Sequence, residues 1–303
     1  MKMHNNPFLI TLLLVLCLCI NVNAQDIRLE YVRSIGEKGT NPGQFSEPRS
    51  VDVDIDGNLY IADTGNNRVQ KLNMNGVFIR MFGGFGWGND QFDLPVSIDA
   101  SSGLDIYVAD LNNSRITRLD RNLNFVSVIQ LDNLRQAEYR FRFPAGMVVS
   151  SLGEKFVLDS ENQRIIKLDA FNNPEIVFGG YSSHGIPLAG PVDLAVFENK
   201  KIFVADIELH AIMVYDYFGN FIDKYSPAVL KSPNGITVDG AGRLFIADEE
   251  RKSIIILDNR GNVLLEYTNA LMKNPVNLSI HKNLLYVVDK ESAMLHLFTI
   301  QPE

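Results

Sequence analysis

Hydrophobic and polar positions follow one pattern that recurs six times between residue 48 and the end of the chain. Each copy begins with Pro, continues through a partly apolar stretch and a turn, and then gives an apolar run that stops at Asp. In the first copy, PRSVDVDIDGNLYIAD, residues 50–55 alternate as a half-buried strand does. The six copies are Pro48–Asp63, Pro95–Asp110, Pro144–Asp159, Pro191–Asp206, Pro233–Asp248 and Pro275–Asp289.

The first copy and the residues after it predict four strands, at 50–55, 59–62, 68–72 and 77–82, with polar turns between them. The Asp56-Gly57-Asn58 sequence is typical of a hairpin turn. Successive prolines lie 47, 49, 47, 42 and 42 residues apart. A period in the forties with four short strands per unit predicts an all-β fold, a six-bladed β-propeller of four-stranded antiparallel blades.

The two ends of the chain predict how the ring closes. The last copy provides strands near 277–280, 284–288 and 295–300, and no residues remain for a fourth strand. Residues 27–35, IRLEYVRSI, stand where a fourth strand would precede the next copy. We therefore expect the N-terminal strand to complete the last blade, which leaves only short, protected edges.

The turn after each repeated Asp also has a pattern. Five residues beyond the Asp, the first three copies carry Arg68, Arg115 and Arg164, whereas the last three carry Ala211, Ser253 and Met294. We expect Asp and Arg to pair and to fix the shape of the turn. A functional ring of carboxylates is the less favoured alternative, because every blade would then have the same role.

A glycine-rich segment precedes the first two prolines of the repeat. Gly36–Pro48 reads GEKGTNPGQFSEP and Gly83–Pro95 reads GGFGWGNDQFDLP, so the glycines, Gln-Phe and Pro are in register. The apolar residue three before each proline persists in all six copies, and we call these residues the plugs: Phe45, Phe92, Phe141, Leu188, Leu230 and Met272. With its Gly-rich loop, Gln-Phe, Pro, Tyr-(Ile/Val)-Ala-Asp and Arg-(Val/Ile), the chain resembles the NHL-repeat family over nearly all of residues 27–300. This resemblance implies a six-bladed propeller, here of an exported bacterial type.

The first 24 residues have the features of a signal peptide. Lys2 precedes an apolar run at 8–20, and Val22-Asn23-Ala24 fits a cleavage site. The run is shorter than the roughly 20 residues of a membrane span. We expect residues 1–24 to be a signal peptide and residues 25–303 to be one propeller domain, exported to the periplasm, the cell surface or the medium.

Cysteine content and net charge bear on how the chain is stabilised and on which classes of partner it could bind. Cys17 and Cys19 lie inside the expected signal peptide, and the leucines that precede them do not fit a lipidation site. The mature chain would then have no cysteine and would rely on its core rather than on disulfides. A formal net charge of −8, from 28 Lys+Arg and 36 Asp+Glu, argues against a nucleic-acid partner or an anionic membrane. We expect a monomer.

Candidate chemistry lies where each innermost strand begins, because these strands line the central channel of a propeller. A pocket there would gather the two residues after each Pro: Arg49, Ser50, Val96, Ser97, Ala145, Gly146, Val192, Asp193, Asn234, Gly235, Val276 and Asn277. Oxygen ligands from Asp193, Asn234 and Asn277 would suit Ca²⁺, although capping of strand ends is the alternative. The histidines have no zinc-like spacing, and the sequence contains neither a G-x-S-x-G elbow nor a P-loop.

The site residues of two enzyme families with similar propellers can be compared with the residues of this pocket. Pro233-Asn234-Gly235 is similar to the Asn-Gly element of the gluconolactonase and regucalcin-like hydrolases, and Glu47-Pro48 is similar to their Glu. Asp193 is one position away from their Asp. The amidating lyases with NHL propellers use zinc histidines and disulfides, for which the matching residues are missing here.

Two loops carry unusual side chains. Phe85 and Trp87 stand where the sister loop has Lys38 and Thr40, and such an aromatic pair could stack on a sugar or anchor a peptide, or pack onto the rim. The other loop, residues 133–143, contains Arg140 and Arg142 among aromatic residues and suits an acidic protein or a glycan.

The sequence therefore favours an exported, non-enzymatic scaffold that binds a protein or a glycan through its loop face. The candidate binding residues are Arg49, Phe85, Trp87, Arg140 and Arg142. The alternative is a lactonase-like hydrolase that depends on a divalent metal, held by Asp193, Asn234, Asn277 and Glu47.

Overall fold

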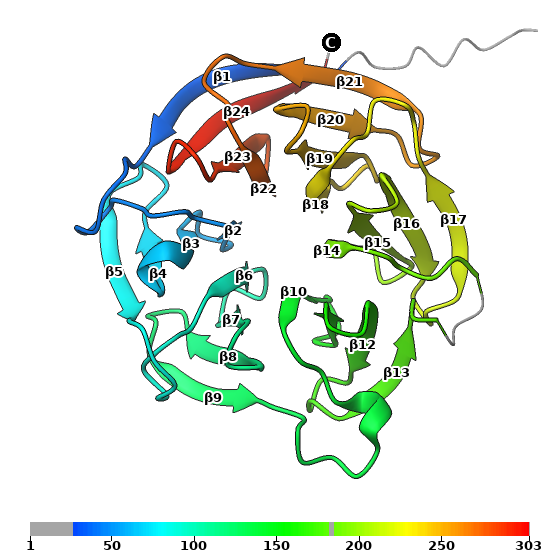
Figure 1. Ribbon diagram of the computed structural model, residues 1–303. Coiled ribbons are helices and arrows are strands. Elements are labelled where there is room, and N and C mark those ends of the chain that lie inside the picture. The colour runs from blue at the N-terminus through cyan, green and yellow to red at the C-terminus, as the bar shows by residue number, and fades with distance from the viewer. Residues whose placement is uncertain (1–26, 182–184, 303) are drawn as a thin grey trace, which may run out of the picture.

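Six four-stranded antiparallel sheets surround a central axis in the computed structural model, as Figure 1 shows. The structure describes residues 27–181 and 185–302, so the expected signal peptide lies outside the described residues. The predicted six-bladed propeller is confirmed.

Blades 1 to 3 follow one another along the chain, and each runs from the axis outward. They contain β2 (Ser50–Val53), β3 (Leu59–Asp63), β4 (Arg68–Leu72) and β5 (Phe78–Gly83); β6 (Pro95–Asp99), β7 (Asp105–Asp110), β8 (Arg115–Asp120) and β9 (Phe125–Ile129); and β10 (Pro144–Val149), β11 (Lys155–Asp159), β12 (Arg164–Leu168) and β13 (Pro174–Phe178). Two 3₁₀ turns, η1 (Thr64–Asn66) and η2 (Ala137–Tyr139), lie in this half.

Blades 4 to 6 repeat the arrangement. They contain β14 (Pro191–Phe197), β15 (Lys201–Asp206), β16 (Ala211–Asp216) and β17 (Phe221–Tyr225); β18 (Pro233–Val238), β19 (Leu244–Asp248), β20 (Ser253–Leu257) and β21 (Val263–Thr268); and β22 (Pro275–His281), β23 (Leu284–Asp289) and β24 (Met294–Pro302), joined by β1 (Ile27–Ile35). In the described part of the chain, no helix is long and apolar enough to cross a membrane.

The ring closes through the N-terminal strand, as predicted. β1 pairs antiparallel with β24 from Ile27 opposite Pro302 to Ile35 opposite Leu295, and the two strands lie side by side in Figure 1. The apolar side chains of Ile27, Leu29 and Ile35 are buried. The last blade thus holds both ends of the described chain.

The hydrophobic core fills the spaces between neighbouring blades. The second strand of a blade is buried on both faces, so all five residues of β3 are buried. The six plugs have exposed fractions of 0 to 4%, which confirms that they are core residues. One strand is shorter than predicted: β2 ends at Val53, because the Asp54 carboxylate accepts the backbone N–H groups of Asp56 and Asn58 and begins the turn.

The repeated Asp residues hold the loop that precedes each innermost strand. All six are fully buried: Asp63, Asp110, Asp159, Asp206, Asp248 and Asp289. The carboxylate of each accepts the backbone N–H of the residue two positions before the repeat Pro, from Ser46, Asp93, Arg142, Ala189, Lys231 and Lys273. These bonds fix the loops to the blades.

Blades 1 to 3 add an arginine to this arrangement. The Nε atoms of Arg68, Arg115 and Arg164 lie 2.7, 2.8 and 3.0 Å from the carboxylates of Asp63, Asp110 and Asp159, as predicted. In blade 2, Arg115 also donates to the carbonyl oxygens of Trp87, Gly88 and Gln91 and so holds the Gly-rich loop.

Blades 4 to 6 replace the arginine with a backbone donor. The backbone N–H three residues beyond the Asp binds its carboxylate, at Leu209, Arg251 and Ser292. Ala211, Ser253 and Met294 can therefore occupy the Arg position without leaving the buried Asp unpaired.

Candidate functional site

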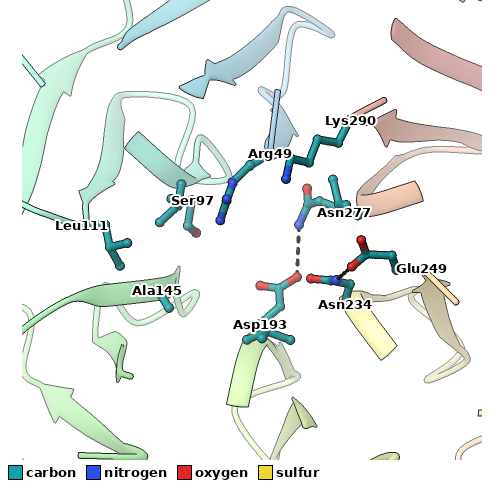
Figure 2. A pocket seen from close by; sticks show the side chains of 12 residues that line it. Arg49, Ser97, Leu111, Ala145, Asp193, Asn234, Glu249, Asn277 and Lys290 are labelled. Carbon is teal, nitrogen blue, oxygen red and sulfur yellow. Dashed lines mark hydrogen bonds between the residues drawn. The ribbon is translucent and has the colours of Figure 1, made fainter. Parts of the chain in front are cut away.

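A cavity of about 230 Å³ opens at one mouth of the central channel. It lies on the face that carries the loops before the innermost strands and the turns after the repeated Asp residues, which we call the loop face. Figure 2 shows its walls, which come from all six blades: Arg49, Val96, Ser97, Leu111, Ala145, Val192, Asp193, Asn234, Glu249, Val276, Asn277 and Lys290.

Most of the predicted channel residues lie in this pocket. Of the predicted set, only Ser50, Gly146 and Gly235 are not among its lining residues. Three lining residues were missed: Leu111, Glu249 and Lys290. Each directly follows a repeated Asp, so the residue after that Asp was the signal that could have found them.

Asp193 and Asn277 join blades across the channel. The Asp193 carboxylate accepts the backbone N–H of Ile236 at 3.0 Å, that of Leu194 at 2.9 Å and the Asn277 amide at 3.0 Å. The Asn277 carbonyl oxygen in turn accepts the backbone N–H of Val51 at 3.1 Å. A side chain on one innermost strand thus accepts a backbone N–H of the innermost strand in the next blade. That N–H faces the channel, where it has no neighbouring strand to pair with.

Asn234 and Glu249 form a second link beside this one. Both oxygens of Glu249 accept amide donors, from Asn234 at 2.5 Å and from Asn274 at 2.9 Å. Gly235 has a steric reason to be glycine, because a Cβ there would come within 2.5 Å of the Asn277 Cα. The Asn-Gly element that resembles the lactonases therefore has a structural role in packing blade 5 against blade 6.

The two cationic side chains of the pocket have fewer hydrogen-bond partners than its carboxylates. The Nε atom of Arg49 is buried and has no hydrogen-bond partner among the described residues. Lys290 lies 3.8 Å from the exposed Glu47 carboxylate. Both side chains point toward the centre of the pocket in Figure 2, so an anion entering it would meet two positive charges.

Carboxyl groups predominate deeper in the channel. A second cavity of about 430 Å³ shares Ser97, Asp193 and Asn277 with the first and is also lined by Asp52 and Asp99. Burial, and then the charge of Asp52, raises the pKa of Asp99 to about 7. Burial also raises the pKa of Asp52 and brings that of Asp193 to about 7.

The predicted metal ligands face one pocket, but their oxygens are largely occupied. Asp193 accepts three hydrogen bonds, and Asn277 uses its carbonyl oxygen on Val51. Within residues 27–181 and 185–302, no three His, Cys, Asp or Glu side chains are placed to hold a metal ion together. Glu47 does not line the channel pocket; it lines a neighbouring cavity that shares Lys290 with it. The Ca²⁺ site stays a prediction.

The predicted aromatic pair is exposed on the loop face. Phe85 and Trp87 are 63% and 73% exposed, and their rings meet edge to face with centroids 6.1 Å apart. In their loop the Gly86 N–H donates to the Phe92 carbonyl, the Phe92 N–H donates to the Gly84 carbonyl, and Arg115 donates to the Trp87 carbonyl. The rings therefore project from a fixed backbone and do not pack into the core.

The arginines of the 133–143 loop differ in their contacts. Arg140 donates twice to the Leu134 carbonyl, at 2.8 and 2.6 Å, and so stabilises its own loop. Arg142 lies 3.3 Å from Glu161, and its side chain is 64% exposed. Of the two, Arg142 is the one that remains available to a partner.

A profile of the NHL repeat matches residues 45–72, which contain the first plug, the first repeated Asp and its Arg. Residues 45–72 are thus an NHL repeat within the six-bladed β-propeller. Protein brain tumor of Drosophila melanogaster is 32% identical over 108 residues, which are 35% of this chain and 10% of that protein. The likeness thus concerns about a tenth of that relative, and its other regions have no counterpart in the match.

Solved structures similar to this propeller include two enzymes and a complex. Virginiamycin B lyase from Staphylococcus aureus has a TM-score of 0.61 and 14% identity, over 91% of this chain and 89% of the other. A gluconolactonase from Xanthomonas campestris has a TM-score of 0.66 and 13% identity over 90% and 98%. A chain of the nidogen/laminin complex has a TM-score of 0.65 and 13% identity over 84% and 97%. At these identities the likeness shows the fold alone.

Proposed function

We propose that this NHL propeller is an exported scaffold that binds a protein or a glycan through its loop face and catalyses no reaction. The observation that carries the proposal is the exposed Phe85–Trp87 pair on a loop whose backbone is fixed by a buried Asp–Arg pair. A rigid aromatic side chain loses little conformational entropy when it binds, and Trp is enriched among the residues that dominate binding energies.

The sister loop supports this role. The bridge between Phe85 and Phe92 matches the bridge between Lys38 and Phe45, so the two loops have the same local pairing. Lys38 occupies the position of Phe85, and the loop is formed without aromatic residues there. The aromatic rings are thus not needed for folding the loop, which leaves recognition as their role.

The experiment exchanges the aromatic pair for the residues of the sister loop. Residues 25–303 are purified as wild type, as a Phe85→Lys/Trp87→Thr double variant, and as a Phe171→Ser control. Phe171 is 85% exposed in the turn between β12 and β13, on the opposite face. Each protein is titrated against a glycan array and against purified surface and secreted proteins of the source cell.

We expect the double variant to lose at least about tenfold in affinity for a ligand that the wild type and the Phe171→Ser protein bind equally. Equal affinity of all three proteins, or no ligand for the wild type in either collection, would contradict the proposal. Recovery of residues 25–303 from the cytoplasm of the source cell would contradict the export part of it.

A metal-dependent hydrolase is the second candidate, because Asp193, Asn234 and Asn277 face one pocket. The test is a thermal melt after EDTA treatment and again with Ca²⁺, Mn²⁺ or Zn²⁺. A cation that binds only the folded state at a hundredfold excess over its dissociation constant adds about 2.7 kcal/mol of stability. If one cation raises the melting temperature and Asn234→Ala removes the effect, lactone and ester substrates come next. No shift with any cation would exclude this candidate.

A further inference from the structure

Arg49 turns its guanidinium group toward the loop-face pocket. Its Nε–H is buried and unpaired among the described residues, and no carboxylate there forms an ion pair with its guanidinium group. A buried donor without an acceptor is unfavourable, and a charged donor in a partly enclosed site binds an anion strongly. A planar carboxylate is the ligand group that a guanidinium fork fits best, through two parallel hydrogen bonds.

The carboxylates of the pocket do not compete for Arg49. Glu249 accepts amide donors from Asn234 and Asn274 on its two oxygens. Asp193 accepts bonds from two backbone N–H groups and from Asn277. Lys290 adds a second positive charge, which lies 3.8 Å from the Glu47 carboxylate. The two cations are thus the groups left to act on a ligand.

The walls of the pocket restrict what is attached to the carboxylate. Its apolar lining is wholly aliphatic: Val96, Leu111, Ala145, Val192 and Val276. Such a wall favours an aliphatic side chain through burial and offers no aromatic face on which a sugar ring could stack. The volume of about 230 Å³ is that of roughly eight water molecules in the liquid, which suits the end of a chain and not an internal segment.

We propose that this pocket captures the C-terminal carboxylate of a protein partner, with Arg49 as the carboxylate ligand and the aliphatic wall around the last side chain. The inference rests on the proposed scaffold function and names a second contact for its partner, besides the aromatic pair. Capture of a free C-terminus is an established way to recognise a peptide.

The probe is a pool of fluorescein-labelled peptides, Gly-Ser-Gly followed by two positions drawn from Ala, Val, Leu and Ile. One half of the pool has free C-termini and the other half has C-terminal amides. Fluorescence anisotropy measures binding to the wild type, Arg49→Gln, Arg49→Lys and Arg260→Gln. Arg260 is an exposed arginine in the turn between β20 and β21, on the opposite face, and its substitution is the matched control.

We expect the free acids to bind at least about tenfold more tightly than the amides. Arg49→Gln removes this difference, Arg49→Lys restores part of it, and Arg260→Gln leaves it unchanged. Equal binding of acids and amides, an unaffected Arg49→Gln protein, or no binding of any member up to about 1 mM would overturn the inference.

Glucuronate, as a competitor, separates a sugar acid from a peptide end. Binding of glucuronate that depends on Arg49, without binding of the peptides, would overturn the assignment to a protein C-terminus. Failure of the peptide experiment while the Phe85→Lys/Trp87→Thr variant still loses its ligand would remove this inference and leave the proposed function intact.

Discussion

Two sets of polar residues lie next to one another on the loop face and have opposite properties. The repeated Asp residues occur in every blade, are fully buried and bind the loop before the innermost strand. The polar residues that line the pocket differ from blade to blade, and one of them, Arg49, has a buried donor without a partner. Repetition thus marks the residues that build a blade, whereas departure from the repeat marks the residues that a ligand could reach.

The same contrast applies to two arginines. Arg115 belongs to the repeat, is buried, and binds Asp110 and three loop carbonyls. Arg49 occupies the position after the repeat Pro, where no other copy has an arginine, and its side chain points into a cavity. One side chain type therefore serves stability in one place and is available for recognition in the other.

The largest effect should follow removal of a repeated carboxylate that has an Arg partner. Asp110→Ala leaves Arg115 buried without its counter-charge, and breaking a buried pair in this way costs about 3–5 kcal/mol of unfolding free energy. Urea denaturation measures it.

The control for Asp110→Ala is Asp206→Ala in blade 4, where the partners of the carboxylate among the described residues are the backbone N–H groups of Ala189, Gly190 and Leu209. We expect a smaller loss there, about 1–3 kcal/mol. Equal losses in the two variants would show that the arginine adds nothing to the blades that carry it.

The next effect is a dependence of stability on pH to which the channel carboxyl groups contribute, besides Asp110 of the repeat, whose pKa is also raised by burial. Burial raises the pKa of both Asp99 and Asp193 from 3.8 to about 7. The folded state therefore holds their protons at pH values where the unfolded state has lost them. Their stabilising contribution is fully present below pH about 4 and is lost as the pH rises through about 7, with a slope of up to about 1.4 kcal/mol per pH unit for each group.

Urea denaturation at a series of pH values between 4.5 and 7.5 measures this slope, and Asp99→Asn should flatten it. His296, whose pKa is lowered by burial, changes stability in the opposite direction, so the comparison with Asp99→Asn isolates the carboxyl group. The turn carboxylates Asp120 and Asp216 have lowered pKa values, so they act below this range. An identical slope in the variant would contradict the account of the channel.

The smallest effect on stability should come from the aromatic pair. Trp87 is 73% exposed, so Trp87→Thr should change the unfolding free energy by no more than about 0.5 kcal/mol. The same denaturation experiment measures it. A loss comparable to that of Asp110→Ala would mean that the ring stabilises the fold by packing onto the rim, which was the alternative to a role in binding.

Much of this architecture could be predicted from the residues. The strands of the first blade, the closing strand at 27–35, the six plugs and the three Asp–Arg pairs all follow from a local pattern, because each is decided within one blade or one loop. The residues after each Pro also converge as expected.

The features that were not predicted depend on contacts between blades. The position after the repeated Asp could have identified Leu111, Glu249 and Lys290. Asp52 and Asp99, four residues beyond their prolines, lie one layer deeper in the channel. The hydrogen-bond partners of the channel side chains come from other blades: Asn277 donates to Asp193 and accepts the backbone N–H of Val51. Spacing within one copy of the repeat does not contain this information.

The most direct test of the contrast is a side-by-side measurement on Arg49→Gln and Arg115→Gln, in which unfolding free energy and affinity for the free-acid peptide pool are determined for both. We expect Arg115→Gln to lose about 3–5 kcal/mol of stability and, while folded, to bind as the wild type does. We expect Arg49→Gln to stay within about 0.5 kcal/mol of the wild type in stability and to lose its preference for the free acid. A destabilised Arg49→Gln protein that still binds, or an Arg115→Gln protein of unchanged stability, would contradict this contrast between the two arginines.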